Sequence, residues 1–343
     1  MKKKIATDRK MAVFSCPGLG DGLVSLQLAY NLSLNGYAVE LFHERQFNEL
    51  QAWTEIPIKK YPKQPDIKKL FSTYEKVFIS QDLDSAWVQA LIREGKKTDP
   101  QKLVVLNPSP SKKLGSQAFY TDTYFRPNLS MVQNIEFFSK NILKLHMTTV
   151  QSPLSFPKNL LKTPIDESLP IEATKNKKTA LKKIIIHPTA SRIGKCWHKQ
   201  KFLKLAKKLE NKGFEVFFVM SQTERESWKI KNKTEKEKGK DQSIKIKTFS
   251  SLHELALFLS QGDIFLGGDS GVAHLAAALG LPTLSLFRSF RLAALWRPGW
   301  AVNKVIAPSN FIPNLSGFRL RDKKWASFIT VRKVKKAILQ LTR

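Results

Sequence analysis

The chain has 343 residues, a formal net charge of +30 and only two cysteines, Cys16 and Cys196. Its length fits two domains of ordinary size, and a hydrophobic fraction of 42% excludes wholesale disorder. Two cysteines are too few for a disulfide framework, and no stretch approaches the roughly 20 apolar residues that a membrane-spanning helix needs. We therefore expect a globular protein from a reducing compartment.

The first half of the chain alternates short β-branched or aromatic runs with longer amphipathic runs, which is typical of a parallel α/β domain. Strands are predicted at 11–16, 38–43, 76–80 and 102–107, and helices over roughly 22–34 and from 128, the latter opened by an Asn or Ser cap. The pattern lapses between about 150 and 182, where Pro, Lys and Thr predominate. We place a first domain at 1–158 and a linker at 159–182.

The alternation then resumes and predicts a second α/β domain at 183–328. Its strands are predicted at 182–188, 214–220, 263–268 and 283–287, and its helices at 199–213, 250–262 and 271–279. A charged loop is expected at 229–243. The last region, 329–343, contains the basic amphipathic run VRKVKKAILQL, a helix that could seal a core or lie on a membrane, of which the first is commoner.

A glycine-rich turn, GGDSG at 267–271, joins a predicted strand to a predicted helix. Such turns lie at the carboxyl edge of a parallel sheet, where helix N-termini bind anions. Capping by Asp269 and Ser270 alone would explain most turns of this kind. It does not explain His274, a polar ring on a helix otherwise made of Ala, Leu and Val, although a lone histidine at such a position is more often an interior residue with satisfied hydrogen bonds than a catalytic one.

Two further turns carry candidate polar groups. After the first strand, Gly18, Gly20 and Gly22 surround Asp21, a candidate general base or simply a first-turn acid favoured by the helix dipole. After the strand at 182–188, Thr189, Ser191 and Lys195 form a candidate phosphate clamp or an ordinary basic surface loop. The G-x-x-x-x-G-K-[ST] phosphate loop is absent.

Together, GLGDGL, HPTASRIGKCW, the Glu after FFVMSQT and the segment through GGDSGVAHLAAALGLPTLSLF resemble glycosyltransferase family 9, the heptosyltransferases of lipopolysaccharide core synthesis. The resemblance covers most of the second half and only the opening motif of the first. It implies an α/β fold of the GT-B type, with two Rossmann-like domains whose parallel sheets face a central cleft. The first domain would bind the acceptor and the second the nucleotide sugar.

The resemblance also implies roles for single residues. Asp21 would be the catalytic base, in a loop whose Gly18, Gly20 and Gly22 lie near the acceptor. Thr189, Ser191 and Lys195 would bind the donor phosphates. Glu224 would contact the nucleoside and fits this role better than Glu226. The diphosphate and the sugar would be bound by Asp269, Ser270, Gly271 and His274. The sequence departs from the family at Gly268, where Asn is usual, and at RSFRLAALW, which replaces a common Gly-Pro-Thr.

The expected activity is an inverting transfer of a sugar, by resemblance heptose from ADP-heptose, to a lipopolysaccharide core or related glycan. We expect no cofactor and no metal, and we interpret Asp82 and Asp84 as helix-capping residues. The expected partners are the nucleotide-sugar donor, an acidic lipid-linked glycan acceptor and an anionic inner-membrane surface, with no nucleic acid. We expect a monomer in the cytoplasm or on the inner face of the cytoplasmic membrane, because the apolar run from Met11 is too short for a signal peptide.

Two other function classes stay open. A sugar-nucleotide epimerase would share the fold and donor site but need no acceptor. A basic non-enzymatic binder of nucleic acid or membrane would account for the charge, although much of that charge lies in lysine runs typical of solvated surface.

Overall fold

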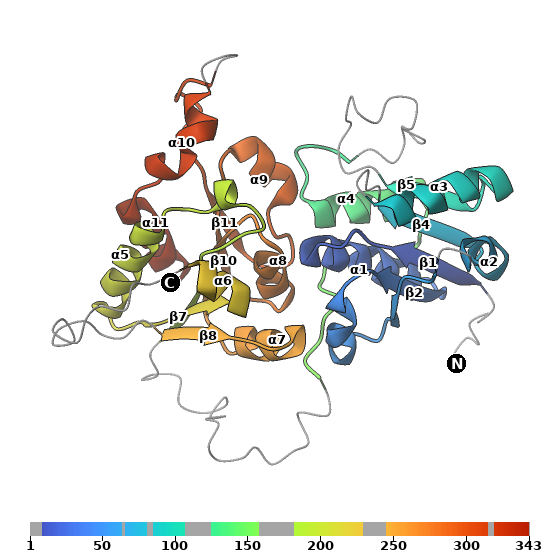
Figure 1. The fold of residues 1–343 in the computed structure, drawn as a ribbon, viewed down its shortest axis with the longest axis horizontal. Helices are drawn as coiled ribbons and strands as arrows, with labels where there is room; N and C mark the ends of the chain where they lie inside the picture. The colour runs from blue at the N-terminus through green and yellow to red at the C-terminus, as the bar shows by residue number, and fades with distance from the viewer. Residues whose placement is uncertain are drawn as a thin grey trace, which may run out of the picture. The chain divides into compact units, whose positions relative to one another are not determined.

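The computed structural model describes residues 9–63, 66–80, 85–106, 125–157, 182–228, 245–314 and 319–342. The chain divides into two compact units, Met1–Ser155 with Arg291–Trp300, and Phe156–Phe290 with Ala301–Arg343. Each unit contains one sheet (Figure 1). Nearly all of the predicted linker at 159–182 lies outside the described residues, so the predicted boundaries stay a prediction. The predicted boundaries place residues 291–300 in the second domain, whereas the structure groups these residues with the first unit.

The first unit is built on a five-stranded parallel sheet with strand order β3-β2-β1-β4-β5. Its strands are β1 (Lys10–Phe14), β2 (Ala38–His43), β3 (Ile58–Lys60), β4 (Lys76–Ser80) and β5 (Leu103–Leu106). Its helical segments are α1 (Leu19–Leu34), η1 (Gln46–Trp53), α2 (Ile67–Thr73), α3 (Ala86–Thr98), α4 (Met131–Phe137), η5 (Phe138–Ile142) and most of α9 (Phe290–Trp296). Ala12 and Phe14 of β1 pack in one cluster with apolar residues of α2 and α3.

Helix α1 begins at Leu19, about three residues earlier than predicted, so that Asp21 lies in its first turn. The helix packs closely against the segment that follows β2. A Cβ atom at Gly22 would lie 2.6 Å from Phe47 Cε2 and 3.0 Å from His43 Cδ2. The His43 and Phe47 rings stack with centroids 4.8 Å apart, and both are buried. Gly22 is therefore a contact surface between α1 and these two rings.

The second unit is built on a six-stranded parallel sheet with strand order β11-β10-β9-β6-β7-β8. Its strands are β6 (Lys183–His187), β7 (Glu215–Met220), β8 (Lys245–Thr248), β9 (Ile264–Gly268), β10 (Thr283–Leu286) and β11 (Asn303–Ile306). Its helical segments are η7 (Ile193–Lys195), α5 (Lys199–Glu210), α6 (Gln222–Ser227), α7 (Leu252–Ser260), α8 (Gly271–Ala278), α10 (Leu320–Phe328) and α11 (Val331–Leu341). The predicted alternation of strands and helices is thus confirmed in this unit.

The C-terminal helix α11 has the bounds that the sequence predicts, and it seals a core. Val334, Ala337 and Ile338 are buried in the cluster that contains the apolar residues of β6, β7 and α5. Among the described residues, no helix combines the length and the hydropathy needed to cross a bilayer.

The close contact at Gly22 predicts that Gly22→Ala destabilises the first unit. The added methyl group would overlap the buried Phe47 ring, and overpacking of this kind costs about 1–3 kcal/mol, more than Ala regains through its better helix propensity. Urea unfolding should therefore show a lower free energy of unfolding for this variant. Gly194→Ala is the matched control, because no atom lies within 4 Å of its added Cβ. Equal losses in the two variants would contradict the packing argument.

Candidate functional site

Three neighbouring strand ends of the second sheet carry most of the predicted polar residues. Strand β6 lies between β9 and β7, and all three are parallel, so their carboxyl ends meet at one edge. His187, the last residue of β6, lies opposite Gly267 of β9. The loop after β6, the start of α6 and the turn before α8 therefore come together at this edge.

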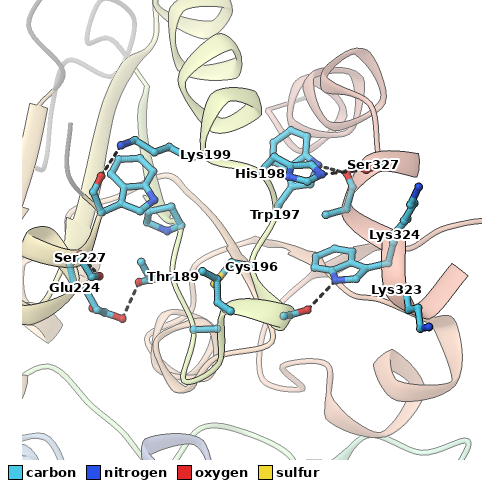
Figure 2. A pocket seen from close by; sticks show the side chains of 17 residues that line it. Thr189, Cys196, Trp197, His198, Lys199, Glu224, Ser227, Lys323, Lys324 and Ser327 are labelled. Atoms are coloured by element: carbon cyan, nitrogen blue, oxygen red, sulfur yellow. Dashed lines mark hydrogen bonds between the residues drawn. The ribbon is translucent and has the colours of Figure 1, made fainter. Parts of the chain in front are cut away.

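Thr189 and Glu224 are in direct contact. The Thr189 hydroxyl donates to Glu224 Oε1 at 2.7 Å, and Figure 2 shows the two side chains pointing toward each other. Glu224 is held by the start of α6, since Ser221 N donates to its Oε2 at 2.8 Å and Ser221 Oγ accepts from its backbone N–H at 3.2 Å. This capping box fixes the carboxylate beside the loop that follows β6.

A histidine that the sequence did not single out completes this contact. His187 Nε2 lies 3.1 Å from Thr189 Oγ1 and 3.5 Å from Glu224 Oε1. Burial alone would raise the pKa of Glu224, but the hydrogen bonding and charge of His187, the Ser221 amide and the Thr189 hydroxyl together lower it to about 2. Glu224 is therefore an ionised, acceptor-only group at neutral pH.

The turn before α8 uses its side chains differently from a simple helix cap. Ser270 occupies the N-cap position, but its side chain makes no capping hydrogen bond. Its Oγ lies instead 3.3 Å from His187 Nδ1. Asp269 Oδ2 forms an ion pair with Lys195 Nζ at 2.7 Å. The first amide groups of α8 consequently stay without a side-chain cap from Ser270.

Gly268 lets the loop after β6 approach β9 closely. A Cβ atom at this position would lie 3.2 Å from the Lys195 carbonyl oxygen, which is a tight contact with backbone. A larger residue at this position, such as the Asn that is usual in the family that the sequence resembles, would have to displace that loop. Glycine at position 268, where the family usually has Asn, thus allows the backbone of Lys195 to lie close to β9.

The remaining predicted residues of the second unit lie around this cluster. Gly271 is the first residue of α8, and His274 is buried on the same helix, with 5% of its surface exposed. Ser191 is exposed on the loop after β6.

The predicted residues of the first unit lie at the start of α1. Gly18 is the N-cap, and Gly20, Asp21 and Gly22 follow in the first turns. The Asp21 carboxylate occupies the space that a side chain at Gly18 would need. His43 Nε2 lies 3.4 Å from Gly18 O, and burial lowers the pKa of His43. The convergence of Asp21 with the second-unit residues on one crevice stays a prediction.

A pocket of about 880 Å³ lies on one side of the Thr189–Glu224 contact. Its walls include Trp228 after α6 and Trp325 of α10. Lys199 of α5 and Lys323 of α10, both labelled in Figure 2, also line it. Of the predicted site residues, only Thr189 and Glu224 line it. The pocket and the Lys195–Asp269 pair therefore flank the same loop without sharing residues.

The structure does not test the prediction of metal independence. Among the described residues, no three His, Cys, Asp or Glu side chains cluster as metal ligands would. Asp82 and Asp84 lie outside the described residues. Metal independence stays a prediction.

Solved structures of similar fold define the class of protein. Escherichia coli ADP-heptose lipopolysaccharide heptosyltransferase II is similar over 97% of this chain and 98% of that chain, with a TM-score of 0.64 and 16% identity. The iron-containing dodecameric glycosyltransferase TibC from enterotoxigenic Escherichia coli is similar over 99% of this chain and 77% of that chain, with a TM-score of 0.53 and 12% identity. At these identities the likeness shows the fold alone, and it confirms the predicted GT-B class.

The family follows from the sequence. Residues 104–312 match glycosyltransferase family 9 (heptosyltransferase), and the chain belongs to this family. Lipopolysaccharide heptosyltransferase 3 of Escherichia coli is 30% identical over 122 residues, which make up 36% of this chain and 35% of that protein. The aligned part thus spans about a third of the length of the curated relative.

The lowered pKa of Glu224 predicts a pH-dependent effect of Glu224→Gln on stability. Because the folded-state value of about 2 lies below the ordinary 4.5, the carboxylate stabilises the fold above about pH 4.5, and this stabilisation is lost as the pH falls toward 2. The variant should lose roughly 1–3 kcal/mol at neutral pH and progressively less on acidification. Urea unfolding over this pH range measures the difference.

Glu226→Gln provides the matched control, because Glu226 lies on the same helix and accepts only from Gln222, at 3.2 Å, among the contacts described. It should change the free energy of unfolding by less than about 0.5 kcal/mol. A Glu224→Gln loss that stayed constant down to about pH 3 would contradict the assigned role of the charge.

Proposed function

We propose that this chain is an inverting glycosyltransferase that moves a sugar from a nucleotide diphosphate donor to a lipopolysaccharide core or related glycan. The observation that carries the proposal is the cluster at the carboxyl edge of the second sheet. There a lysine, a helix N-terminus that the Ser270 side chain does not cap, and an ionised carboxylate lie around adjacent strand ends. This combination suits a ligand that has both an anionic diphosphate and hydrogen-bond donors.

Lys195 and the start of α8 would hold the diphosphate. The amide groups at a helix N-terminus carry an effective charge of roughly +0.5 and bind anions. Lys195 is paired with Asp269 and 38% of its side-chain surface is exposed, so its ammonium is accessible to a stronger anion. Ser191, on the same loop, would add a hydroxyl donor, whereas the Thr189 hydroxyl donates to Glu224 and would hold that carboxylate beside the loop.

Glu224 would bind the nucleoside. An ionised carboxylate only accepts hydrogen bonds, and the vicinal hydroxyls of a ribose are suitable donors. The proposed donor is ADP-heptose, by analogy with the name of the structurally similar Escherichia coli heptosyltransferase II. His274 would contact diphosphate or sugar from within α8.

Asp21 would act as the general base. In the proposed step, an acceptor hydroxyl oxygen forms a bond to the anomeric carbon while Asp21 takes the hydroxyl proton. The bond from that carbon to the diphosphate oxygen breaks. The departing nucleoside diphosphate carries the negative charge, which Lys195 and the N-terminus of α8 would stabilise. A single displacement inverts the anomeric configuration, and the fixed positive groups would make a metal unnecessary.

Ligand binding tests the donor site. A panel of nucleoside diphosphates and their sugar conjugates should raise the thermal unfolding temperature most for ADP and ADP-sugars, because a ligand that binds only the folded state stabilises it by mass action. Lys195→Ala should reduce the ADP-induced shift, whereas Lys336→Ala on α11 should leave it unchanged. The absence of a shift with every nucleotide would refute the donor site and favour the non-enzymatic alternative.

Asp21→Asn tests the catalytic step. The variant should lower kcat by roughly 10²- to 10⁴-fold, with little change in donor KM, because it removes the base and keeps the shape of the side chain. Asp322→Asn is a matched control, since Asp322 is a first-turn carboxylate of α10 in the other unit. Steady-state kinetics with donor and acceptor measures both variants.

The same assay separates the alternatives. Conversion of the sugar nucleotide without acceptor would support the epimerase, and turnover abolished by EDTA and restored by a divalent cation would contradict metal independence. If Asp21→Asn lowered stability by the few tenths of a kcal/mol of a helix-dipole contact and left kcat intact, Asp21 would be a first-turn acid only.

A further inference from the structure

His187 connects the two halves of the proposed donor site. Its Nε2 faces the Thr189 hydroxyl and the Glu224 carboxylate, at 3.1 and 3.5 Å, and its Nδ1 faces the Ser270 hydroxyl at 3.3 Å. His187 is the last residue of β6, and 4% of the residue is exposed. One imidazole therefore joins the proposed nucleoside carboxylate to the proposed diphosphate turn.

The hydrogen-bond network fixes the proton on one ring nitrogen. Thr189 has a single hydroxyl hydrogen, which it donates to Glu224 Oε1 at 2.7 Å. Toward His187 the Thr189 oxygen must therefore accept, so that Nε2 carries a hydrogen. The protonation state of the ring then differs only at Nδ1, which faces Ser270.

The two states of Nδ1 turn the Ser270 hydroxyl in opposite directions. A neutral ring has a lone pair at Nδ1, and it accepts the Ser270 hydrogen. A doubly protonated ring donates from Nδ1 to Ser270 Oγ, and the Ser270 hydrogen is then available to another acceptor. Only the second state lets Ser270 donate to a phosphate oxygen.

Several ionisable groups lie on the loop after β6 and on α6 and α8, the segments that follow the three neighbouring strands β6, β7 and β9. They include Glu224 on α6, Lys195 and Cys196 on the loop after β6, and Asp269 and His274 at or within the start of α8. Lys195 and Asp269 neutralise each other at 2.7 Å, and burial raises the pKa of the Cys196 thiol. The Glu224 carboxylate is thus the charged group in closest described contact with the ring, and it is the partner that an imidazolium requires.

We propose that His187 is a positioning residue that couples diphosphate binding to proton uptake, by turning the Ser270 hydroxyl toward the ligand when its ring is protonated. The proposal rests on the donor site described under the proposed function. It adds to that binding step a proton that the His187 ring takes up.

The coupling has a measurable consequence. If the diphosphate binds the protonated ring preferentially, affinity rises as the pH falls through the range in which histidine titrates, roughly pH 5 to 8. A single linked proton limits this change to about tenfold per pH unit. ADP-glucose is a suitable probe, because each of its two phosphates carries one ester and one anhydride bond and therefore has a single, strongly acidic group that stays ionised over this range.

The experiment measures the Kd of ADP-glucose by calorimetry from about pH 5 to 8 for wild type, His187→Asn and Ser270→Ala. Asn places a permanent neutral donor near the position of Nδ1, so His187→Asn should bind with little pH dependence. Ser270→Ala keeps the imidazole and removes the hydroxyl that it orients, so binding should weaken by roughly three- to tenfold at the acidic end and lose its slope. A role limited to structure would change affinity equally at every pH.

His146→Asn is the matched control. His146 is exposed, and its backbone N–H donates to Asn35, the C-cap of α1. Asp21 lies at the other end of that helix. The His146→Asn variant should therefore keep the wild-type pH dependence of the Kd. An unchanged slope in either site variant, or pH-independent binding by wild type, would overturn the proposal while leaving the donor site intact. If wild type bound neither ADP-glucose nor ADP at any pH, the donor site itself would fail, and the coupling with it.

Discussion

The alignment of β6 between β9 and β7 is the constraint on which the candidate site depends. Parallel strands that share a register end at one edge, so the residues that follow them emerge side by side. His187 lies opposite Gly267, where the neighbouring strand has no side chain to compete for space. A slip of β6 by one residue would turn His187 to the other face of the sheet and separate it from Thr189 and Ser270. The polar contacts of the site are therefore a consequence of strand pairing.

The site is also organised by charge compensation. A partly buried carboxylate costs free energy unless donors surround it, and both carboxylates of the cluster have such donors. Glu224 has a hydroxyl, an amide and an imidazole beside it, and Asp269 has Lys195. These two carboxylates are thus compensated within the site, although the formal charge of the whole chain is +30. A ligand that binds there has to replace these contacts with equally strong ones, which favours a multiply charged anion over a neutral sugar.

Some of the first unit depends on contacts that join distant parts of the chain. Gln27 is fully buried on α1, and its side chain donates to Thr149 O at 2.9 Å and accepts from Trp300 Nε1 at 2.7 Å. The segment 291–300 therefore belongs with the first unit, although more than 130 residues separate it from the remainder of that unit.

Strand β8 and helix α6 were not predicted from the sequence. Strand β8 alternates exposed and half-buried residues at the end of a lysine-rich run, and α6 is six residues long without a buried face.

The sequence by itself determined the elements whose pattern is strong. Short β-branched or aromatic runs predicted β2 and β4 at their observed bounds, and a 3.6-residue stripe predicted α11. Gly280, with its φ of +88°, follows the end of α8 as expected. It also identified the turn residues of the candidate site, because glycine, aspartate and lysine at strand ends are a local signal. Tertiary structure alone decided what these residues contact. His187 reads in sequence as the last residue of a buried strand, and its partner Ser270 lies 83 positions away, so only the pairing of β6 with β9 brings the two side chains within hydrogen-bonding distance.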